Sequence, residues 1–458
     1  MSTPTKGGGQ VQISSLKLYH NSVKTVASAK KSDMFLDLLS IYAGFNMRES
    51  ITQPFMTAEI MINDSNDIIA DYPIVGGEIF HIVYSVPSGD DDTKVSLWFR
   101  TTGIRGIIYD ERKQGFTLQL ISESGFKNLN TNISTAFTGA PHDIVAQVYD
   151  SYLRNDDTKQ GIAIDRSTGG IKVVCPRWKP SQIIRYVMNR AVDYENDSAG
   201  FFFFQTPHGF RFLSTSTLLD AKRNIVITDV MAQASSVRAD GKLKKGYHYK
   251  IPSIPIIGDD GKPTSGMVGD ETMQNVDDFR VDDRQLFAED ITKGYIASKH
   301  ITHDIFHKSY NIETYNYFDD FSKQKRLAKF PQYVNYEKDV SSDVKVMLSP
   351  KHTKVQDGYK NLFPDDYLSS RHNITKQIND NLITNFQVPG NPIFCSGRLL
   401  EFNFPAIKKV STPDDSYQKK YSGMYLIRDC IHIMKPVANA TASYKCDANI
   451  VRDGFNEL

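Results

Sequence analysis

The feature that most constrains the fold of this chain is a strict two-residue alternation close to its C-terminus, over residues 442–450. Every second residue is apolar or small, and the residues between them are polar or charged. Successive side chains of a β-strand point to opposite faces, so this pattern predicts a strand with one packed and one solvated face. The packed set is Ala442, Tyr444, Cys446, Ala448 and Ile450, and the solvated set is Ser443, Lys445, Asp447 and Asn449.

Two segments just before it complete a three-stranded pattern. Residues 398–405 alternate in the same way, with Leu400, Phe402 and Phe404 on one face. Residues 424–434 are apolar on both sides, which is typical of a central strand with a neighbour on each edge. Together the three segments predict the closing half of a small antiparallel β-barrel.

A second series of strands is predicted in the N-terminal region. Residues 1–9 end in three glycines and contain nothing to bury, so we expect a disordered arm. From Val11 onward, short strand patterns follow one another with Gly, Pro or Asp turns and no helix between them, which predicts an antiparallel sandwich or barrel. The predicted strands include residues 55–64, 78–85, 95–101 and 116–122.

Two helices are predicted in the middle of the chain. Asp143 is the expected N-cap of the first helix. The second helix begins at Pro180, because a proline at a helix start loses no hydrogen bond. Their apolar faces are Ile144, Val145, Val148, Tyr149, Tyr152 and Leu153 in the first helix and Ile183, Ile184, Val187, Met188, Ala191 and Val192 in the second.

A β-hairpin and a long loop follow the helices. Residues 200–213 predict a hairpin that turns between Thr206 and Gly209. Its four consecutive phenylalanines, residues 201–204, indicate a strand buried on both faces. Residues 251–290 are rich in acids and prolines, which predicts a long surface loop. Strand-forming residues return after position 294.

Composition excludes several classes of function. The 458 residues exceed what one core usually supports, so several domains are expected. Lys and Arg total 54 against 53 for Asp and Glu, so no net field favours nucleic acid or an acidic membrane. No apolar run approaches the roughly 18 residues of a membrane span, and no secretion signal is present.

The four cysteines are scattered and show no metal-binding spacing, which favours a reducing compartment. Cys395, Cys430 and Cys446 fall on the predicted C-terminal strands, where we interpret their thiols as small hydrophobic groups.

His303 and His307 form the most suggestive metal-binding pattern, because two histidines four residues apart on a helix can bind zinc. Asp304, however, stands where a metalloprotease has glutamate, and the neighbouring residues favour a strand. On a strand the two histidines would lie roughly 13 Å apart at about 3.3 Å per residue. We therefore expect no metal here. The acids of residues 259–283 also lack the spacing of a calcium loop.

Glu401 and Asp429 could be considered a glycosidase pair, but nothing else in the sequence builds a sugar cleft around them. Phosphate-binding glycine loops and a nucleophile elbow are also missing from the sequence. The sequence therefore assigns no catalytic, cofactor-binding or metal-ligating residue.

Several short motifs occur in an order that resembles the baseplate hub subunits of contractile-tailed bacteriophages, whose relatives include the T-even phage hub and the base of VgrG-type spikes. The motifs are Met47-Arg48-Glu49-Ser50 before the strand from Thr57 to Asn63, Pro73 to Glu78, Phe203 to Thr206 with Gly209 to Phe212, Pro389 to Pro392, Gly423 to Ile427 leading to His432, and Arg452-Asp453.

This resemblance implies an α+β fold in which two antiparallel β-barrel domains flank a central α/β domain. The first barrel is expected at residues 10–125 and the central domain at residues 126–287, including the acidic loop. The second barrel is expected from residues 288–318 together with 382–455. A helical insertion, residues 319–381, would split it and pack with the central domain.

The resemblance also implies a structural function without enzymatic activity or cofactors. Relatives form homotrimers in which two barrels per chain give a pseudo-sixfold ring, joining a threefold spike to a sixfold tail tube. Expected partners are a spike, the tube or its initiator, and other baseplate proteins, in a virion tail assembled in the host cytoplasm. Because little sequence follows Phe455, the spike is expected to be a separate trimeric protein. A tail-associated cell-wall or capsule hydrolase is the alternative.

Overall fold

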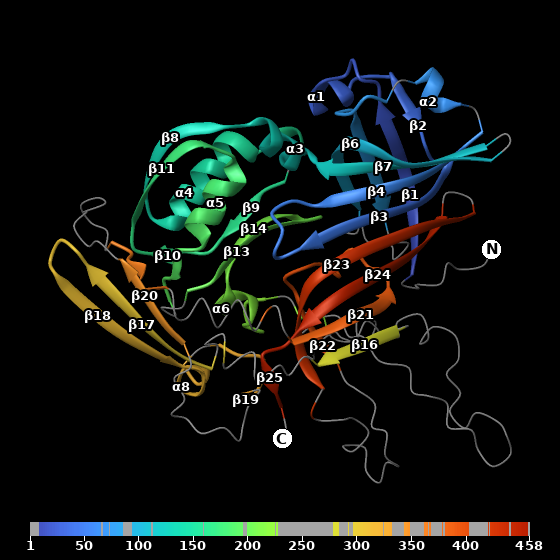
Figure 1. The fold of residues 1–458 in the computed structure, drawn as a ribbon. Helices are drawn as coiled ribbons and strands as arrows, with labels where there is room; N and C mark the ends of the chain where they lie inside the picture. Colours follow the sequence, from blue (N-terminus) through green and yellow to red (C-terminus); the bar gives the residue numbers. More distant parts are fainter. Residues whose placement is uncertain are drawn as a thin grey trace, which may run out of the picture.

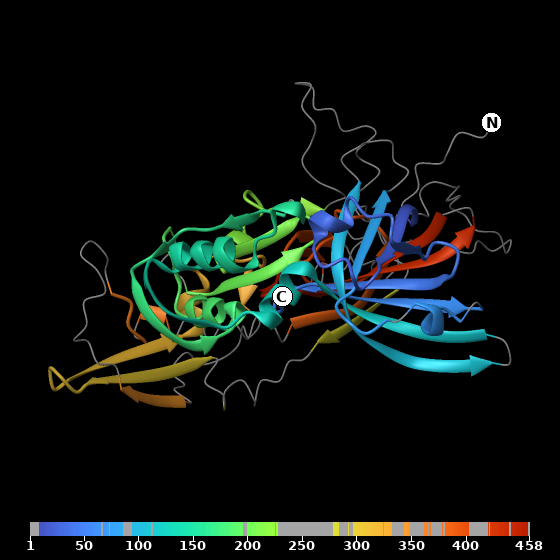
Figure 2. The ribbon, with the colours of Figure 1, turned by 90° about the horizontal axis from the view of Figure 1, so that it is seen from above.

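The protein is mostly β-structure, dominated by one large, largely antiparallel sheet with a mixed group of helices and strands beside it (Figure 1 and Figure 2). The computed structural model describes residues 9–65, 67–72, 74–85, 94–110, 113–158, 160–195, 199–224, 226–227, 278–283, 292, 296–323, 325–331, 343–348, 361–364, 366–367, 378, 381–402, 420, 422–438 and 441–456.

Eight strands of the large sheet pair one after another to form a closed ring. In pairing order they are β23 (Gly423–Ala438), β3 (Tyr42–Ser50), β4 (Thr57–Asp64), β7 (Lys113–Ser122), β6 (Val95–Asp110), β5 (Ile79–Ser85), β1 (Gln10–Tyr19) and β24 (Thr441–Val451). The ring closes because β24 pairs back with β23. Its interior is largely apolar, with Phe45, Phe80 and Phe99 fully buried.

The predicted N-terminal strands are therefore confirmed, although β6 continues nine residues beyond its expected end, from Thr101 to Asp110. The expected N-terminal arm lies outside the described residues except for Gly9. That residue is held in place, since its carbonyl oxygen accepts a hydrogen bond of 2.8 Å from the Tyr444 N–H.

A second group of strands extends the sheet beyond the ring. It comprises β15 (Val226–Ile227), β22 (Leu399–Phe402), β21 (Asn381–Pro389) and β16 (Asp278–Asp283). Together with β23 and β24 they pair in the order β15-β22-β23-β24-β21-β16, here named the second sheet.

β23 and β24 form a hairpin, here named the junction hairpin, that belongs to both the ring and the second sheet (Figure 1). The edge of β23 that faces away from β24 pairs with β22 at residues 423–426 and with β3 at residues 429–434. The edge of β24 that faces away from β23 pairs with β1 at residues 441–443 and with β21 at residues 445–451. Each strand thus divides its edge between the two parts of the sheet.

One hydrophobic core continues through both parts, from Phe45 in the ring to Phe386 and Phe402 in the second sheet. The predicted packed face of β24 is confirmed, since none of its five residues is more than 2% exposed. The opposite face is half-buried rather than fully solvated, because both edges of β24 are covered by neighbouring strands.

The central domain packs two helices between short sheets, around a core rich in phenylalanine (Figure 1). Its elements are α3 (Glu123–Asn130), β8 (Ile133–Gly139), α4 (Pro141–Val148) with a π-helical turn (Tyr149–Leu153), a 3₁₀ turn (Asp156–Thr158), β9 (Ile162–Ile164), β10 (Ser167–Thr168), β11 (Ile171–Trp178), α5 (Pro180–Met188), β12 (Val192–Asp193), β13 (Phe201–Thr206), β14 (Gly209–Ser214) and α6 (Thr215–Leu218).

Asp143 is not the N-cap that we expected. Helix α4 begins earlier, at Pro141, and Ala140 occupies the N-cap without a side-chain hydrogen bond. Proline already has the helical φ angle and no N–H to satisfy, so it starts the helix without a polar cap. Helix α5 begins at Pro180 as predicted but ends before Ala191, which lies beyond it.

The predicted phenylalanine hairpin is confirmed as β13 and β14. Three of its four consecutive phenylalanines are buried and Phe202 is half-buried. Gly209 begins the second strand with φ of +121°, and a Cβ there would lie 2.7 Å from the Gly161 carbonyl oxygen. Only glycine fits this position without displacing the backbone.

Residues 297–316 do not join the second sheet as we expected. They form β17 (Ala297–Asp304) and β18 (Ser309–Asn316), which pair with β20 (Asp343–Leu348) in a separate three-stranded sheet, here named the outer sheet. Both edges of β17 are occupied within it. Strand-forming residues identify a strand but not its partner, which explains the error.

The acidic segment was also predicted incompletely. Within it, residues 278–283 are not a loop but form β16, which pairs with β21 at the end of the second sheet. An edge strand tolerates charged residues, so its acids do not exclude pairing. The rest of the segment, residues 251–277 and 284–290, lies outside the described residues.

Residues 319–381, where we expected a helical insertion, are described only in part, and the described part contains helical residues at the end of α8 (Tyr317–Phe321) as well as the strands β20 and β19 (Phe330–Pro331). It does contact the central domain, where the Leu362 N–H donates to the Gly170 carbonyl at 3.3 Å and Tyr367 packs on Val192 and Ala199.

Short elements complete the structure: α1 (Val26–Ala29), β2 (Phe35–Asp37), α2 (Ile68–Asp71), α8 (Tyr317–Phe321) and β25 (Gly454–Phe455), the last of which pairs with β19. Within the described ranges, no helix has the length and apolar composition needed to cross a membrane.

We predict that Tyr444→Asp abolishes folding and that Lys445→Glu does not. Tyr444 is fully buried, so the aspartate would be an unpaired charge in the core, which costs as much as the whole stability of a typical domain. Lys445 lies on the half-buried face, 3.2 Å from Gln387 Oε1. Circular dichroism and thermal melting measure both, and a folded Tyr444→Asp protein would contradict the inward position of this side chain.

We also predict that Gly390→Ala lowers the stability by about 1–3 kcal/mol or more, because it overpacks the core. A Cβ on Gly390 would lie 2.2 Å from Cγ of Tyr444. Gly161→Ala is the matched control, since a Cβ there meets no described atom within 4 Å. Urea unfolding compares the two variants, and equal stabilities would show that residue 390 has room for a side chain.

Candidate functional site

A polar cluster lies inside the protein where the junction hairpin meets β3 and the turn before β22. The two strands of the hairpin contribute its thiols and its imidazole, and β3 contributes a carboxylate. None of the side chains is more than 3% exposed. The cluster consists of Glu49, Cys430, His432, Tyr444 and Cys446.

His432 is the centre of the cluster because both of its ring nitrogens have partners. Nδ1 lies 2.7 Å from the Tyr444 hydroxyl and 3.4 Å from Sγ of Cys446. Nε2 lies 3.3 Å from Oε1 of Glu49, on the other side of the ring. The imidazole therefore connects the two strands of the hairpin to β3.

Glu49 connects the cluster to the turn before β22. Its Oε1 accepts a hydrogen bond of 2.9 Å from the Ser396 N–H, and its backbone carbonyl accepts from the Ser396 hydroxyl at 3.2 Å. Oε2 is buried and has no hydrogen-bond partner among the described residues. The carboxylate thus connects His432 to the turn that contains Ser396. This turn lies more than three hundred residues after β3 in the sequence.

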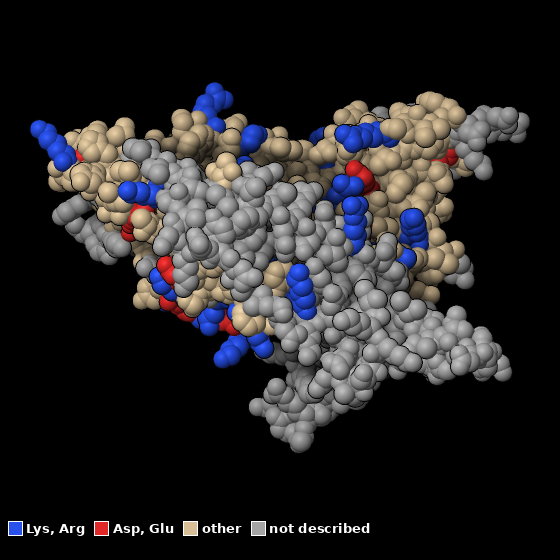
Figure 3. All heavy atoms as spheres, turned by 60° about the horizontal axis from the view of Figure 1, so that its bottom comes forward, with Lys and Arg blue, Asp and Glu red and all other residues tan. Residues whose placement is uncertain are grey.

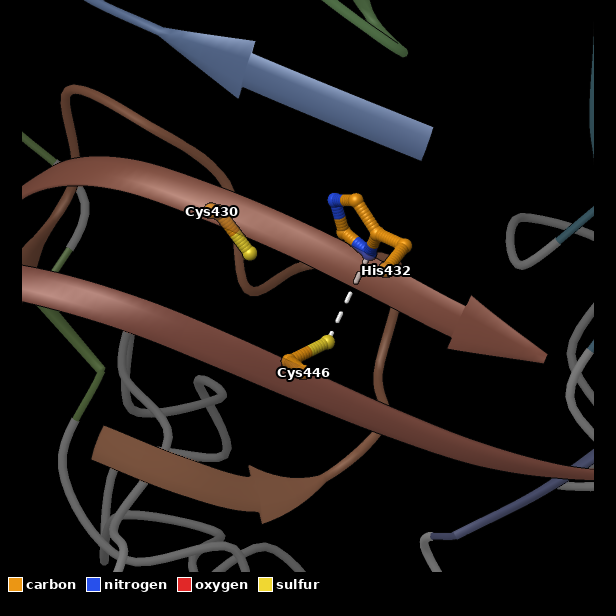
Figure 4. Close-up of side chains that lie close together, drawn as sticks. All are labelled: Cys430, His432 and Cys446. Carbon is orange, nitrogen blue, oxygen red and sulfur yellow. Dashed lines mark hydrogen bonds between the residues drawn. The ribbon is translucent and has the colours of Figure 1, made fainter. Parts of the chain in front are cut away.

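The thiols of Cys430 and Cys446 converge with the imidazole, as Figure 4 shows. The Cys430 thiol also lies 3.5 Å from the Phe394 carbonyl, and the Cys446 thiol lies 3.9 Å from the Asn391 carbonyl. The expectation of buried strand residues is correct for Cys430 and Cys446, whereas Cys395 is buried but lies in the turn before β22. Their thiols, however, have polar partners and are more than small hydrophobic groups.

The electrostatics of the cluster favour charge separation between Cys446 and His432. Burial alone would lower the pKa of His432, but the Cys446 thiolate and the Glu49 carboxylate raise it to about 10. Burial alone would raise the pKa of Cys446, but hydrogen bonds with Cys430 and His432 and the imidazolium charge hold it well below its usual range. The pKa of the Cys430 thiol is raised well above its usual range, chiefly by burial.

Thiolate and imidazole groups are nucleophiles and metal ligands. Because these side chains are fully enclosed, they cannot reach a dissolved substrate in this conformation. The arrangement is suited to holding strands together or to binding a small ion.

The histidines that the sequence singled out lie elsewhere and do not form a site together. His303 is on β17 and is exposed, as expected for a strand histidine. His307 lies in the turn after β17, not on the same strand, and its Nδ1 is 2.5 Å from Oδ2 of Asp304. Asp304 is therefore bound locally by the turn.

Glu401 and Asp429, which the sequence analysis considered together, lie on the neighbouring strands β22 and β23, and both are half-buried. Asp429 is held by structural contacts, with Arg428 at 2.7 Å and Asn449 at 3.1 Å, and it also accepts a hydrogen bond from Ser50. A cleft of about 580 Å³ lies between Ile51 of the ring edge and helix α5, but no carboxylate, histidine or cysteine lines it. This cleft therefore lacks the pair of carboxylates that glycoside hydrolysis requires.

Charge is dispersed over the face of the molecule in Figure 3. Lys and Arg side chains are scattered there and interspersed with acidic ones. Among the residues that the structure describes, this face shows no concentrated basic surface of the kind that binds a nucleic-acid backbone.

Sequence reasoning missed the cluster, although a signal for it exists. Cys430 and His432 are two residues apart on one predicted strand, and Cys446 stands on the next. In the structure His432 is directly opposite Cys446, so the register of the hairpin brings them together. Nothing in the sequence indicated that Glu49 belongs to the cluster, because it is nearly four hundred residues away from His432.

No known protein-family profile matches this chain, and no curated protein matches its sequence. Solved structures do resemble it. The tail protein from Neisseria meningitidis MC58 matches with 9% identity over 97% of each chain and a TM-score of 0.49. The 43 kDa tail protein of prophage MuSo2 from Shewanella oneidensis has 8% identity over 97% of this chain and 98% of that one, with a TM-score of 0.49.

A PdpA–VgrG complex from Francisella has 8% identity and a TM-score of 0.43, covering 100% of this chain and 60% of that chain. The resemblance to phage tail proteins that the sequence predicted is thus found again in the comparison of structures. At these identities and TM-scores it assigns no function by itself.

We predict that Glu49→Ala destabilises the protein by about 3–5 kcal/mol, because it leaves the buried imidazolium of His432 without its carboxylate. Glu59→Ala is the matched control on the neighbouring strand. Its carboxylate lies 3.8 Å from an exposed Arg48, and loss of such a pair costs at most about 1 kcal/mol. Chemical denaturation measures both, and equal small losses would contradict a structural role for Glu49.

Proposed function

We propose that this protein is a structural baseplate hub subunit of a contractile phage tail, without enzymatic activity. The observation that carries the proposal is the junction hairpin, which fixes the ring and the second sheet side by side over one core. A hub that presents two similar barrels per chain requires such a rigid connection. The order of sequence motifs from Met47 to Asp453 supports the same function.

In the proposed architecture, residues 10–125 form the first barrel, completed by the junction hairpin. Residues 126–287, apart from β15 and β16, form the central domain, and residues 382–455 together with β15 and β16 form the second barrel. Residues 319–381 pack with the central domain. The outer sheet takes no part in the second barrel, and we propose that it is used for assembly.

The proposed assembly is a homotrimer in the virion tail. Two barrels per chain around a threefold axis present pseudo-sixfold symmetry to a sixfold tube and true threefold symmetry to a spike. The partners are accordingly a threefold spike, the tube or its initiator, and neighbouring baseplate proteins. An obligate assembly of this kind buries more than about 2,000 Å².

A cyclic trimer needs two different surfaces on each chain. The first surface of one copy binds the second surface of the next copy. Two projecting hairpins at opposite ends of the molecule provide candidates (Figure 2). At the β6–β7 end, Ile108 and Tyr109 are 69% and 76% exposed. At the end of the outer sheet, Phe306 and Tyr310 are 56% and 71% exposed. Apolar side chains so exposed mark contact surfaces when they are clustered.

The first test is the mass of the purified chain in solution, by analytical ultracentrifugation. We expect three times the mass of one chain. Ile108→Lys and Phe306→Lys, at the two ends, should each give monomers, because each places a charge in the interface. Val174→Lys is the control and should leave the trimer intact, since Val174 is 67% exposed on β11 of the central domain and belongs to neither hairpin.

A mixture of the Ile108→Lys and Phe306→Lys proteins distinguishes this arrangement from others. One intact surface remains on each variant, so the mixture should form a heterodimer but no closed trimer. A mixture that stays monomeric would show that the two hairpins do not meet. A wild-type chain that remains monomeric even with other baseplate proteins, or that hydrolyses peptidoglycan or capsule, would overturn the hub proposal.

A further inference from the structure

Three side chains that can bind a metal ion meet on the junction hairpin. The Sγ atoms of Cys430 and Cys446 and a ring nitrogen of His432 all lie within 4.8 Å of one another (Figure 4). The distance from Cys446 Sγ to His432 Nδ1 is 3.4 Å. Thiolate and imidazole are the ligands that zinc prefers in structural sites.

The sheet itself determines this geometry. Cys430 and His432 are two residues apart on β23, so their side chains share a face. His432 is paired directly with Cys446 on β24. Neither strand has a free edge at this point, because β3 covers one and β21 the other. The ligands therefore converge on a rigid scaffold and not on a loop.

The distances suit a tetrahedral ion. With Zn–S of about 2.3 Å and Zn–N of about 2.0–2.1 Å, a tetrahedral site separates its nitrogen and sulfur ligands by about 3.6 Å and its two sulfurs by about 3.8 Å. The separation of 3.4 Å between Cys446 and His432 matches, and the upper limit of 4.8 Å for the set requires only a small movement of side chains.

The outer contacts of His432 are those of a metal ligand. Its Nδ1 faces the two thiols, and its Nε2 is 3.3 Å from the Glu49 carboxylate. A histidine that binds a metal through one nitrogen usually donates its other N–H to a carboxylate or carbonyl, which fixes the ring and increases its basicity. Glu49 is itself fixed by the Ser396 N–H at 2.9 Å.

We propose that Cys430, His432 and Cys446 bind one structural Zn²⁺ ion inside the junction hairpin. The fourth position is available to the Tyr444 hydroxyl, which lies 2.7 Å from the same ring nitrogen. On binding, the Cys430 thiol and the His432 imidazolium each lose one proton to solvent, so that both cysteines bind as thiolates and His432 binds as the neutral imidazole. The two thiolates neutralise the charge of the ion, so the buried site has no net charge from the metal and its sulfur ligands.

The ion would join β23 to β24 and, through His432 and Glu49, to β3. It would thus stabilise the point at which the ring and the second sheet meet. This inference is independent of the proposed hub function, because it concerns only the interior of one chain.

Elemental analysis of the protein, purified without chelator or affinity metal, is the first test. We expect about one Zn²⁺ per chain. Cys446→Ser and His432→Gln should lose the metal, whereas Cys175→Ser, which alters a buried thiol of the central domain, should retain it. His303→Ala should retain it as well, and loss of zinc from that variant would place the metal in the outer sheet.

Cobalt substitution tests the site without any variant, which matters if the ligand variants fail to fold. Protein refolded with Co²⁺ should show the strong visible bands of a tetrahedral ion and the near-ultraviolet charge-transfer bands of thiolate ligands. A folded wild-type protein that contains no stoichiometric metal after refolding with Zn²⁺, and shows no such bands with Co²⁺, would overturn the proposal. The cluster would then be a thiolate–imidazolium pair only.

Discussion

The pairing of β23 with β24 is the interaction on which the rest of the structure depends. It closes the ring, because β23 meets β3 and β24 meets β1, and it begins the second sheet, because the same strands meet β22 and β21. Since side chains alternate between faces, a shift of one residue in this register would turn the packed face of β24 toward solvent. The two parts would then lose their common core together.

A buried polar cluster at this junction has a physical consequence for specificity. Hydrogen bonds among buried groups are satisfied in one register only, and a displaced strand would leave His432 or Glu49 without partners at a cost of several kcal/mol. Apolar residues alone would tolerate more than one arrangement. The cluster therefore supports a single alignment of β3, β23 and β24, whether or not it also holds an ion.

Much of the fold and little of the site could be predicted from the sequence. Alternation identified β24, and Pro180 identified the start of α5, because both are local properties. The cluster required three separate segments to meet, and only the pair of Cys430 and His432 was close in sequence. Glu49 comes from the N-terminal region, and no local pattern indicates which distant strand it will face.

The sequence by itself determined where strands and helices form and which faces they bury, since two-residue and helical periods depend on neighbouring residues. Only the tertiary structure decided which strands pair. It placed β17 in an outer sheet, β16 at the edge of the second sheet and β23 between two others. The physical reason is that backbone hydrogen bonds are the same for every sequence, so partner choice depends on the fit of side chains across the whole core.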